Sequence, residues 1–342
     1  MGHIRPKTEA LSRRQLLRMS ALGVGGAALL GAGPYTADSQ PGHSQENAER
    51  RGFAVAHDAN STVGEYNVSI FDPMRYLREF DYGKTTPLPD GTTLREFHIF
   101  AADRTIEIAP GVAFEAWTYN GQVPGPTLRA IEGDLVRVHF VNGSAHPHTI
   151  HFHGFHPAEM DGVFEIVDSG GSFTYEFRAE PFGLHLYHCH VMPLKRHLHK
   201  GLYGVFIVDP AQGRPEADEL VMVMNAFDTD GDGENEFYAV NTQAFYYFHH
   251  PIKISKGELI RVYLVNLTEF DLINSFHTHA TFFDVYSTGT RLEPDAYTDT
   301  IVLGQAERAI LEFSYRWPGR YLFHAHVSEF AELGWTGAFE VE

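Results

Sequence analysis

The sequence has 342 residues, among them 21 histidines and a single cysteine. One cysteine excludes an intramolecular disulfide framework and any cysteine-rich zinc or iron–sulfur site. The formal charge of −18 argues against nucleic acid or an anionic membrane surface as a partner. Histidine is the commonest metal ligand among side chains, so its excess makes a metal site the first hypothesis.

The N-terminal segment, residues 1–50, is predicted to be an export signal and linker outside the fold. Arg13 and Arg14 precede a weakly apolar stretch over residues 19–33, which is too short to span a bilayer. This pattern is typical of a twin-arginine signal. We therefore expect a periplasmic or secreted protein with no stable membrane anchoring. Residues 51–94 are interpreted as an N-terminal extension.

The remaining chain contains an internal repeat. The segment GDLVRVHFVN at residues 133–142 recurs as GELIRVYLVN at residues 257–266, and each copy alternates apolar and polar residues as a strand does. Each copy is followed, in the same order, by two His-x-His pairs and an apolar closing strand. The repeat predicts an all-β protein of two β-sandwich domains, at residues 95–210 and 211–342.

Strand geometry divides the candidate ligands into two sets, because residues i and i+2 of a strand point to the same side. Cys189 lies between two paired histidines and therefore faces the opposite way. His148, three residues before His151, also faces away from the pair that His151 begins. The paired set has eight members: His151, His153, His188, His190, His277, His279, His324 and His326.

The set around Cys189 has the composition of a blue-copper site, which is a thiolate, two imidazoles and a weak axial ligand. The loop after Cys189 offers His197 or His199 as the second imidazole. Met192 is the only nearby thioether, whereas Leu202 in the axial position would leave copper with three ligands. The eight paired histidines suit several metal ions, because a structural zinc site closes at four ligands.

An acidic segment, residues 228–236 (DTDGDGENE), resembles the first half of an EF-hand calcium loop. Its twelfth position is Ala239, where a bidentate glutamate is expected. An acidic turn between strands is the simpler interpretation.

The His-Cys-His segment and its three partner pairs resemble the multicopper oxidases, specifically their two-domain, laccase-like branch, over about residues 95–342. The resemblance implies two cupredoxin-like Greek-key domains and four coppers per subunit, and it favours His197 over His199. It implies type 2 copper at His151 and His277, and type 1 copper at Cys189, His148 and His197 with Met192 as the axial ligand. It implies a type 3 copper pair at His153, His188, His190, His279, His324 and His326.

Domain 2 departs from this pattern at two positions. Ala325 stands where domain 1 has Cys189, and Asn274 stands where it has His148, so the resemblance implies type 1 copper in the first domain only. In this family each trinuclear cluster lies between two cupredoxin domains. A two-domain chain is therefore expected to form a homotrimer with its clusters between subunits.

The reaction implied by the resemblance is one-electron oxidation of a phenolic or similar small donor, coupled to four-electron reduction of O2 to water. Electrons would pass from type 1 copper through Cys189 to its neighbours in the chain. Asp161 matches a family carboxylate near type 2 copper, so it is a candidate proton relay or hydrogen-bond partner, or else a simple turn residue. Glu329 and Glu332 are weaker candidates on the type 3 side.

Two other functions compete with this one. A copper nitrite reductase is also a two-domain trimer, but its catalytic copper needs only three histidines, so four complete pairs favour the oxidase. A non-enzymatic copper-storage or electron-transfer cupredoxin would explain Cys189 but not the eight paired histidines.

Overall fold

The computed structural model describes residues 64–342. The predicted export signal and the first part of the predicted extension lie outside the described residues. In the part of the chain that is described, no helix is long and apolar enough to cross a membrane.

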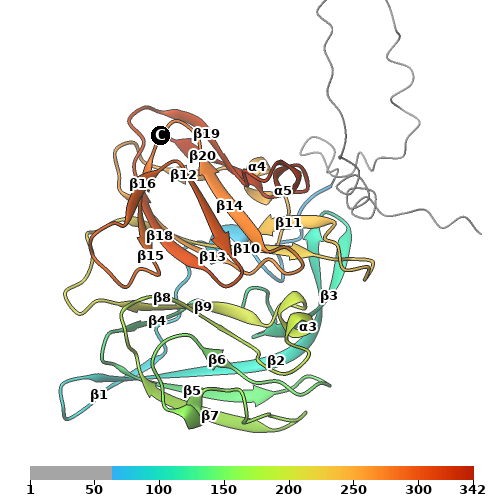
Figure 1. Cartoon of the computed structure of the whole chain (residues 1–342), viewed down its shortest axis with the longest axis vertical. Helices are drawn as coiled ribbons and strands as arrows, with labels where there is room; N and C mark the ends of the chain where they lie inside the picture. Colours follow the sequence, from blue (N-terminus) through green and yellow to red (C-terminus); the bar gives the residue numbers. More distant parts are fainter. Residues whose placement is uncertain (1–63) are drawn as a thin grey trace, which may run out of the picture. The chain divides into compact units, whose positions relative to one another are not determined.

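Domain 1 is a sandwich of two sheets (Figure 1). Its elements are β1 (Lys84–Pro87), β2 (Thr93–Ala109), β3 (Val112–Tyr119), β4 (Leu128–Ile131), β5 (Leu135–Asn142), β6 (His151–Phe152), η3 (Ala158–Met160), β7 (Ser172–Arg178), β8 (Gly183–His188), α3 (Leu194–His199) and β9 (Tyr203–Asp209). One sheet has the order β1–β2–β5–β7, with β3 paired to β2, and the other has the order β4–β9–β8–β6. Buried side chains of both sheets, such as Val138 and Phe206, form one apolar core between them.

Domain 2 repeats this sandwich with additional strands. Its elements are β10 (Asp218–Phe227), β11 (Phe237–Val240), α4 (Tyr246–His249), β12 (Ile252–Ile254), β13 (Ile260–Asn266), β14 (Ile273–Thr278), β15 (Phe283–Ser287), β16 (Ala296–Thr298), β17 (Thr300–Gly304), β18 (Arg308–Phe313), β19 (Gly319–His324), α5 (Ser328–Glu332) and β20 (Thr336–Val341). The sheet orders are β11–β10–β13–β18–β15–β16 and β12–β20–β19–β14–β17. The all-β prediction is therefore confirmed.

The internal repeat appears in the strand register as well as in the sequence. In domain 1, β6 pairs with β8 so that His151 lies opposite His188. In domain 2, β14 pairs with β19 so that His277 lies opposite His324. The two His-x-His pairs of each repeat therefore lie side by side on neighbouring antiparallel strands.

A shared apolar core joins the two domains. It includes Leu184 and Leu186 of β8 together with Tyr263 and Val265 of β13. For this reason every residue of β13 is buried, whereas its counterpart β5 alternates between buried and more exposed positions. Backbone contacts reinforce the junction, since Leu184 N–H donates to the Thr288 carbonyl at 2.7 Å. The two domains are therefore joined by both side-chain and backbone contacts.

Part of the predicted extension packs against both domains. Helix α2 (Pro73–Tyr76) is capped by Asp72, whose carboxylate accepts from two backbone N–H groups of its first turn. Such capping satisfies donors that have no partner within the helix. Leu77 is fully buried in the core of domain 2, while the hydroxyl of Tyr76 donates to the Gly125 carbonyl of domain 1 at 3.2 Å.

Candidate metal centres

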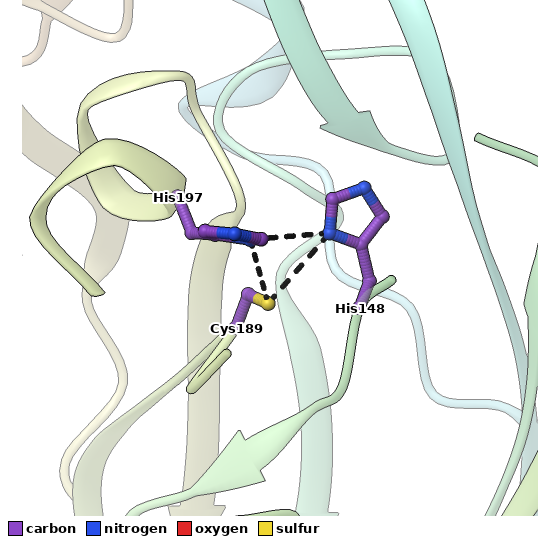
Figure 2. Close-up of side chains that lie close together, drawn as sticks. All are labelled: His148, Cys189 and His197. Carbon is purple, nitrogen blue, oxygen red and sulfur yellow. Dashed lines mark hydrogen bonds between the residues drawn. The ribbon is translucent and has the colours of Figure 1, made fainter. Parts of the chain in front are cut away.

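Three buried side chains from separate segments meet at one point in domain 1. His148 precedes β6, Cys189 follows β8, and His197 lies in α3. Cys189 Sγ is 3.3 Å from His197 Nδ1 and 3.8 Å from His148 Nδ1, and the two Nδ1 atoms are 3.2 Å apart. Figure 2 shows the thiol and the two rings directed toward one another. We call this group the cysteine site.

Hydrogen bonds outside the cysteine site fix the orientation of His148. Ser144 Oγ donates to Asp103 Oδ1 at 2.7 Å, and His148 Nε2 lies 3.0 Å from the same Ser144 oxygen. A hydroxyl has one proton to give, so His148 Nε2–H donates to Ser144. The lone pair of His148 Nδ1 is then free to face Cys189, whose sulfur also lies 3.5 Å from the Thr149 backbone nitrogen.

Burial sets the charge of the cysteine site. Loss of solvent lowers the pKa of His148 to about 3 and that of His197 to about 4, so both rings are neutral near pH 7 and can donate lone pairs. Burial also raises the pKa of the Cys189 thiol. A metal ion would therefore have to displace the thiol proton.

The alternative ligands in the loop after Cys189 differ in where their side chains lie. His199 is directed elsewhere, because its Nε2 accepts from the Asp228 backbone N–H at 3.0 Å. Met192, predicted as the axial ligand, has a side chain that is 75% exposed while Cys189 is fully buried, and its axial role stays a prediction. Leu202, the other axial candidate, is fully buried in the same apolar cluster as Cys189.

The four paired histidines of domain 1 form a second group. His151 contacts the rings of His153, His188 and His190 at centroid distances of 5.2, 5.2 and 5.4 Å. His153 Nε2 and His188 Nε2 are 3.3 Å apart. Burial lowers the pKa of His153 to about 3 and that of His188 to about 4, which keeps both rings neutral.

Domain 2 has an equivalent group. His277 contacts the rings of His279, His324 and His326 at 5.1, 5.3 and 5.2 Å, and His279 Nε2 lies 3.1 Å from His324 Nε2. This group is open to solvent, because His279 and His326 are exposed and His277 and His279 line a pocket of 740 Å³.

The same backbone hydrogen bonds orient the rings in both groups. His188 Nδ1–H donates to the Cys189 carbonyl at 2.9 Å, and His324 Nδ1–H donates to the Ala325 carbonyl at 2.8 Å. His151 Nδ1–H donates to the Asp161 carbonyl at 2.8 Å, and His277 Nδ1–H donates to the Asp299 carbonyl at 2.9 Å. Such bonds fix the tautomer and leave Nε2 as the ligand atom.

Asp161 lies beside the domain 1 group, at the end of η3. Its Oδ1 is 3.1 Å from His151 Nδ1 and 3.7 Å from His156 Nε2. The carboxylate is therefore placed to orient His151, whereas its role in proton transfer stays a prediction. His156 was missed at the sequence level, because it lies outside the His-x-His spacing. Glu329 and Glu332 are both exposed on α5.

The acidic segment forms the turn between β10 and β11. Oxygens of Asp228, Asp230, Asp232 and Glu236 lie within 4.8 Å of one another. Asp228 accepts from the backbone N–H groups of the turn at 2.6 and 2.8 Å, as the carboxylate of a structural turn does. Calcium binding stays a prediction.

Comparison with known proteins shows which family the chain is similar to. Two family models described as multicopper oxidase match residues 101–213 and 215–342. A crystal structure of a multicopper oxidase is 55% identical, with a TM-score of 0.80, and the match covers 81% of this chain and all of that one. A copper nitrite reductase from Nitrosomonas europaea is 25% identical, with a TM-score of 0.66, covering 73% of this chain and 94% of that one.

A copper-containing nitrite reductase from Neisseria gonorrhoeae is 33% identical over 245 residues, which is 66% of this chain. The match spans 62% of that protein's length.

The fold and the donor sets define a copper protein built from two cupredoxin-like Greek-key domains. A thiol and neutral imidazoles are the ligands that copper prefers, and here they converge without a carboxylate in the cysteine site. The chain belongs to the multicopper oxidase family.

Proposed function

We propose that this protein is a laccase-like oxidase, which takes single electrons from phenolic or similar donors and reduces O2 to water. The observation that carries the proposal is the completeness of both histidine groups. Each domain brings four imidazoles together in the same register, which is more than a catalytic copper with three histidines would need.

Four coppers per subunit would be held by these residues: one type 1 copper by Cys189, His148 and His197, and one type 2 and two type 3 coppers by the paired histidines. When bound, copper supplies one-electron transfer at the cysteine site and four-electron reduction of O2 at the histidine groups. The chain links the two, because Cys189 is bonded to His188 and His190 on either side. The His188 Nδ1–H···O=C bond to Cys189 adds a second short connection.

The placement of the histidine groups supports a homotrimer. Each cluster of candidate ligands within residues 64–342 that includes histidines draws them from one domain only, and a shared apolar core joins the two domains. Exposed aromatic side chains lie next to each group, namely Phe155 (68% exposed) and Phe282 (49% exposed). We propose that domain 1 of one subunit and domain 2 of the next complete each trinuclear cluster.

Nitrite reduction is the second candidate, and the similarity to the Neisseria gonorrhoeae nitrite reductase favours it. Such an enzyme would hold fewer coppers and would leave some of the paired histidines without a metal. Export by the twin-arginine route to the periplasm or outside the cell completes the proposal, and it would suit a protein that takes up copper before export.

Copper content, absorption and substrate consumption test the proposal together. We expect four coppers per chain, a strong thiolate band in the red, a trimer by light scattering, and O2 uptake with 2,6-dimethoxyphenol. Two coppers per chain with anaerobic nitrite consumption would establish the second candidate instead. An active monomer with four coppers would contradict the shared clusters.

A further inference from the structure

The turn before the cysteine site is bonded to a carboxylate that lies outside the site. Asp103, an exposed residue of β2, accepts a hydrogen bond at each carboxylate oxygen from the turn that follows β5. The Ser144 hydroxyl donates to its Oδ1 at 2.7 Å, and the Ala145 backbone N–H donates to its Oδ2 at 3.2 Å. None of the ion pairs found within residues 64–342 includes Asp103. Its negative charge is therefore directed into the turn.

Ser144 connects this carboxylate to the cysteine site. The residue is buried, and its side-chain oxygen accepts from His148 Nε2–H at 3.0 Å and from the His146 backbone N–H at 3.2 Å. A hydroxyl has one proton and two acceptor lone pairs. With both lone pairs occupied, the proton of Ser144 goes to Asp103. The result is a directed chain of hydrogen bonds from the His148 imidazole through the Ser144 hydroxyl to the Asp103 carboxylate.

This chain acts on His148 in two ways. A hydrogen bond donated by the outer nitrogen of a ligand imidazole makes its other nitrogen a stronger donor toward a metal. The charge of Asp103 also reaches the ring, since burial lowers the pKa of His148 and Asp103 acts against this lowering. Both effects favour the more highly charged state of a bound metal, which for copper is the oxidised state.

Domain 2 has the equivalent turn without the carboxylate. Asn142 Oδ1 accepts from the Ser144 N–H, and Asn266 Oδ1 accepts from the Thr268 N–H, both at 3.0 Å. Thr268 therefore stands where domain 1 has Ser144. Its hydroxyl contacts Asn274, and no carboxylate within residues 64–342 accepts from it. In the described chain the carboxylate thus accompanies the domain that has the cysteine site.

We infer that Asp103 lowers the reduction potential of copper at the cysteine site, acting as a positioning residue through Ser144 and His148. This inference rests on the copper that the proposed function places there, and it deepens that function by restricting the donors. A lower potential favours electron-rich phenols, such as those with methoxy groups, over unsubstituted phenol.

Redox titration of the thiolate band in the copper-loaded protein tests the charge. Asp103→Asn keeps an oxygen for Ser144 and removes only the negative charge. We expect the preference for oxidised over reduced copper to fall about tenfold, the lower end for an outer partner of a metal ligand, which raises the potential by about 59 mV. Glu115→Gln removes another exposed charge from the neighbouring strand β3 and should leave the potential unchanged. No shift in Asp103→Asn, or equal shifts in both variants, would overturn the inference.

Substitutions of Ser144 test the path. Ser144→Thr keeps the hydroxyl, as Thr268 does in domain 2, and should keep the potential. In Ser144→Ala the potential should rise. Adding Asp103→Asn to Ser144→Ala should then change the preference for oxidised copper by less than about twofold, because the connection is already broken. A full effect of Asp103→Asn in this background would refute the path through Ser144.

The copper-free, full-length chain gives a measurement that does not depend on the metal. With 15N-labelled histidine, nuclear magnetic resonance should show the proton of His148 on Nε2. This N–H should exchange with solvent about fivefold faster in Asp103→Asn than in the native chain or Glu115→Gln, since a charge-assisted hydrogen bond becomes a neutral one. A proton on Nδ1, or equal exchange throughout, would contradict the chain of hydrogen bonds. If the copper-loaded protein consumes nitrite and no O2, the proposed function fails, and the potential and exchange measurements still decide this inference.

Discussion

The region around Cys189 in domain 1 and the region around Ala325 in domain 2 have the same backbone framework and different side chains. Cys189 N–H donates to the Leu202 carbonyl at 3.0 Å, and Ala325 N–H donates to the Trp335 carbonyl at 3.1 Å. In each region a short helix lies between the two hydrogen-bonded residues. This helix is α3 in domain 1 and α5 in domain 2.

The side chains that complete the cysteine site are replaced one by one in domain 2. Asn274 takes the place of His148, and its amide donates to Thr268 Oγ1 at 2.9 Å, as His148 does to Ser144. Phe330 takes the place of His197. The Trp335 N–H donates to the Phe330 carbonyl at 2.9 Å, just as the Leu202 N–H donates to the His197 carbonyl at 3.3 Å.

An apolar stack closes the position in domain 2. Phe330 lies 3.9 Å from Tyr238 with an interplanar angle of 13°, whereas His197 is tilted 60° against Trp117 at 4.9 Å. The comparison shows that a metal site and a packed core can share one framework, and that the side chains alone decide between them.

Removing the thiol should have the largest effect. In Cys189→Ser the visible thiolate band should vanish and phenol oxidation should fall to background, because no other sulfur lies in the site. Absorption spectra and O2 uptake check this. Ala325→Ser, the equivalent change in domain 2, is the control and should leave both unchanged. A strong red band in Cys189→Ser would contradict the assignment.

Single histidines of the two domains should be equally important. His151→Ala and His277→Ala should each lower O2 reduction at least about 100-fold, since even an outer partner of a metal ligand is worth 10–100-fold. Both variants should keep the thiolate band. If one variant loses activity and the other does not, the domains do not contribute to a common cluster.

For the free energy of unfolding, we expect the larger effect in domain 2, at Phe330, and the smaller effect in domain 1, at His197. Phe330→Ala should destabilise the copper-free protein by about 3–5 kcal/mol, as expected for a large buried ring. His197→Ala should cost less, because it removes a polar ring that makes no apolar stack of this kind. Urea unfolding followed by circular dichroism measures both. A larger loss for His197→Ala would show that the cysteine site is itself a core element.

The copper-free protein should lose stability in acid because of the domain 1 histidines. Burial lowers the pKa of His148 to about 3 and that of His153 to about 3, below the value near 6.5 of an unfolded histidine. The unfolded chain therefore takes up protons first, and stability falls as pH drops below about 6.5 toward 3. His148→Asn, which copies domain 2, should weaken this dependence. An unchanged unfolding profile between pH 7 and pH 4 would contradict it.

The smallest effect is expected at the axial position. Leu202→Met should lower the reduction potential of the cysteine site by adding a weak thioether ligand, with little loss of stability, since the two side chains have similar volumes. Met192→Leu should leave the potential unchanged, because Met192 is 75% exposed. Redox titration of the thiolate band distinguishes them, and a shift in Met192→Leu alone would restore Met192 as the ligand.

The features predicted from the sequence are those that depend on local periodicity. Alternation along a strand separates Cys189 from His188 and His190, and the structure places the cysteine and the paired histidines in different groups. The repeated segments also identify the strands β5 and β13, because each has turn residues at both ends.

The features that the sequence did not reveal depend on tertiary packing. Met192 and Leu202 are both apolar residues near Cys189, and only the path of the loop decides which is buried. Trp117 comes from β3, far from the histidine motifs, and its contact with α3 has no sequence signal. The equivalence of Phe330 and His197 was not predicted. The helices α5 and α3 begin at different distances from the ends of the preceding strands, so the two residues do not align in the sequence.

The segment His188–Cys189–His190, at the end of β8, belongs to two sites on opposite sides of the chain. A substitution on one side leaves the other intact, as Ala325 does in domain 2, where the histidines on either side still form their group. An insertion or deletion of one residue would instead exchange the two sides. Over evolutionary time this segment is therefore free to lose or regain a metal site by point substitution, but it cannot change length without losing both sites at once.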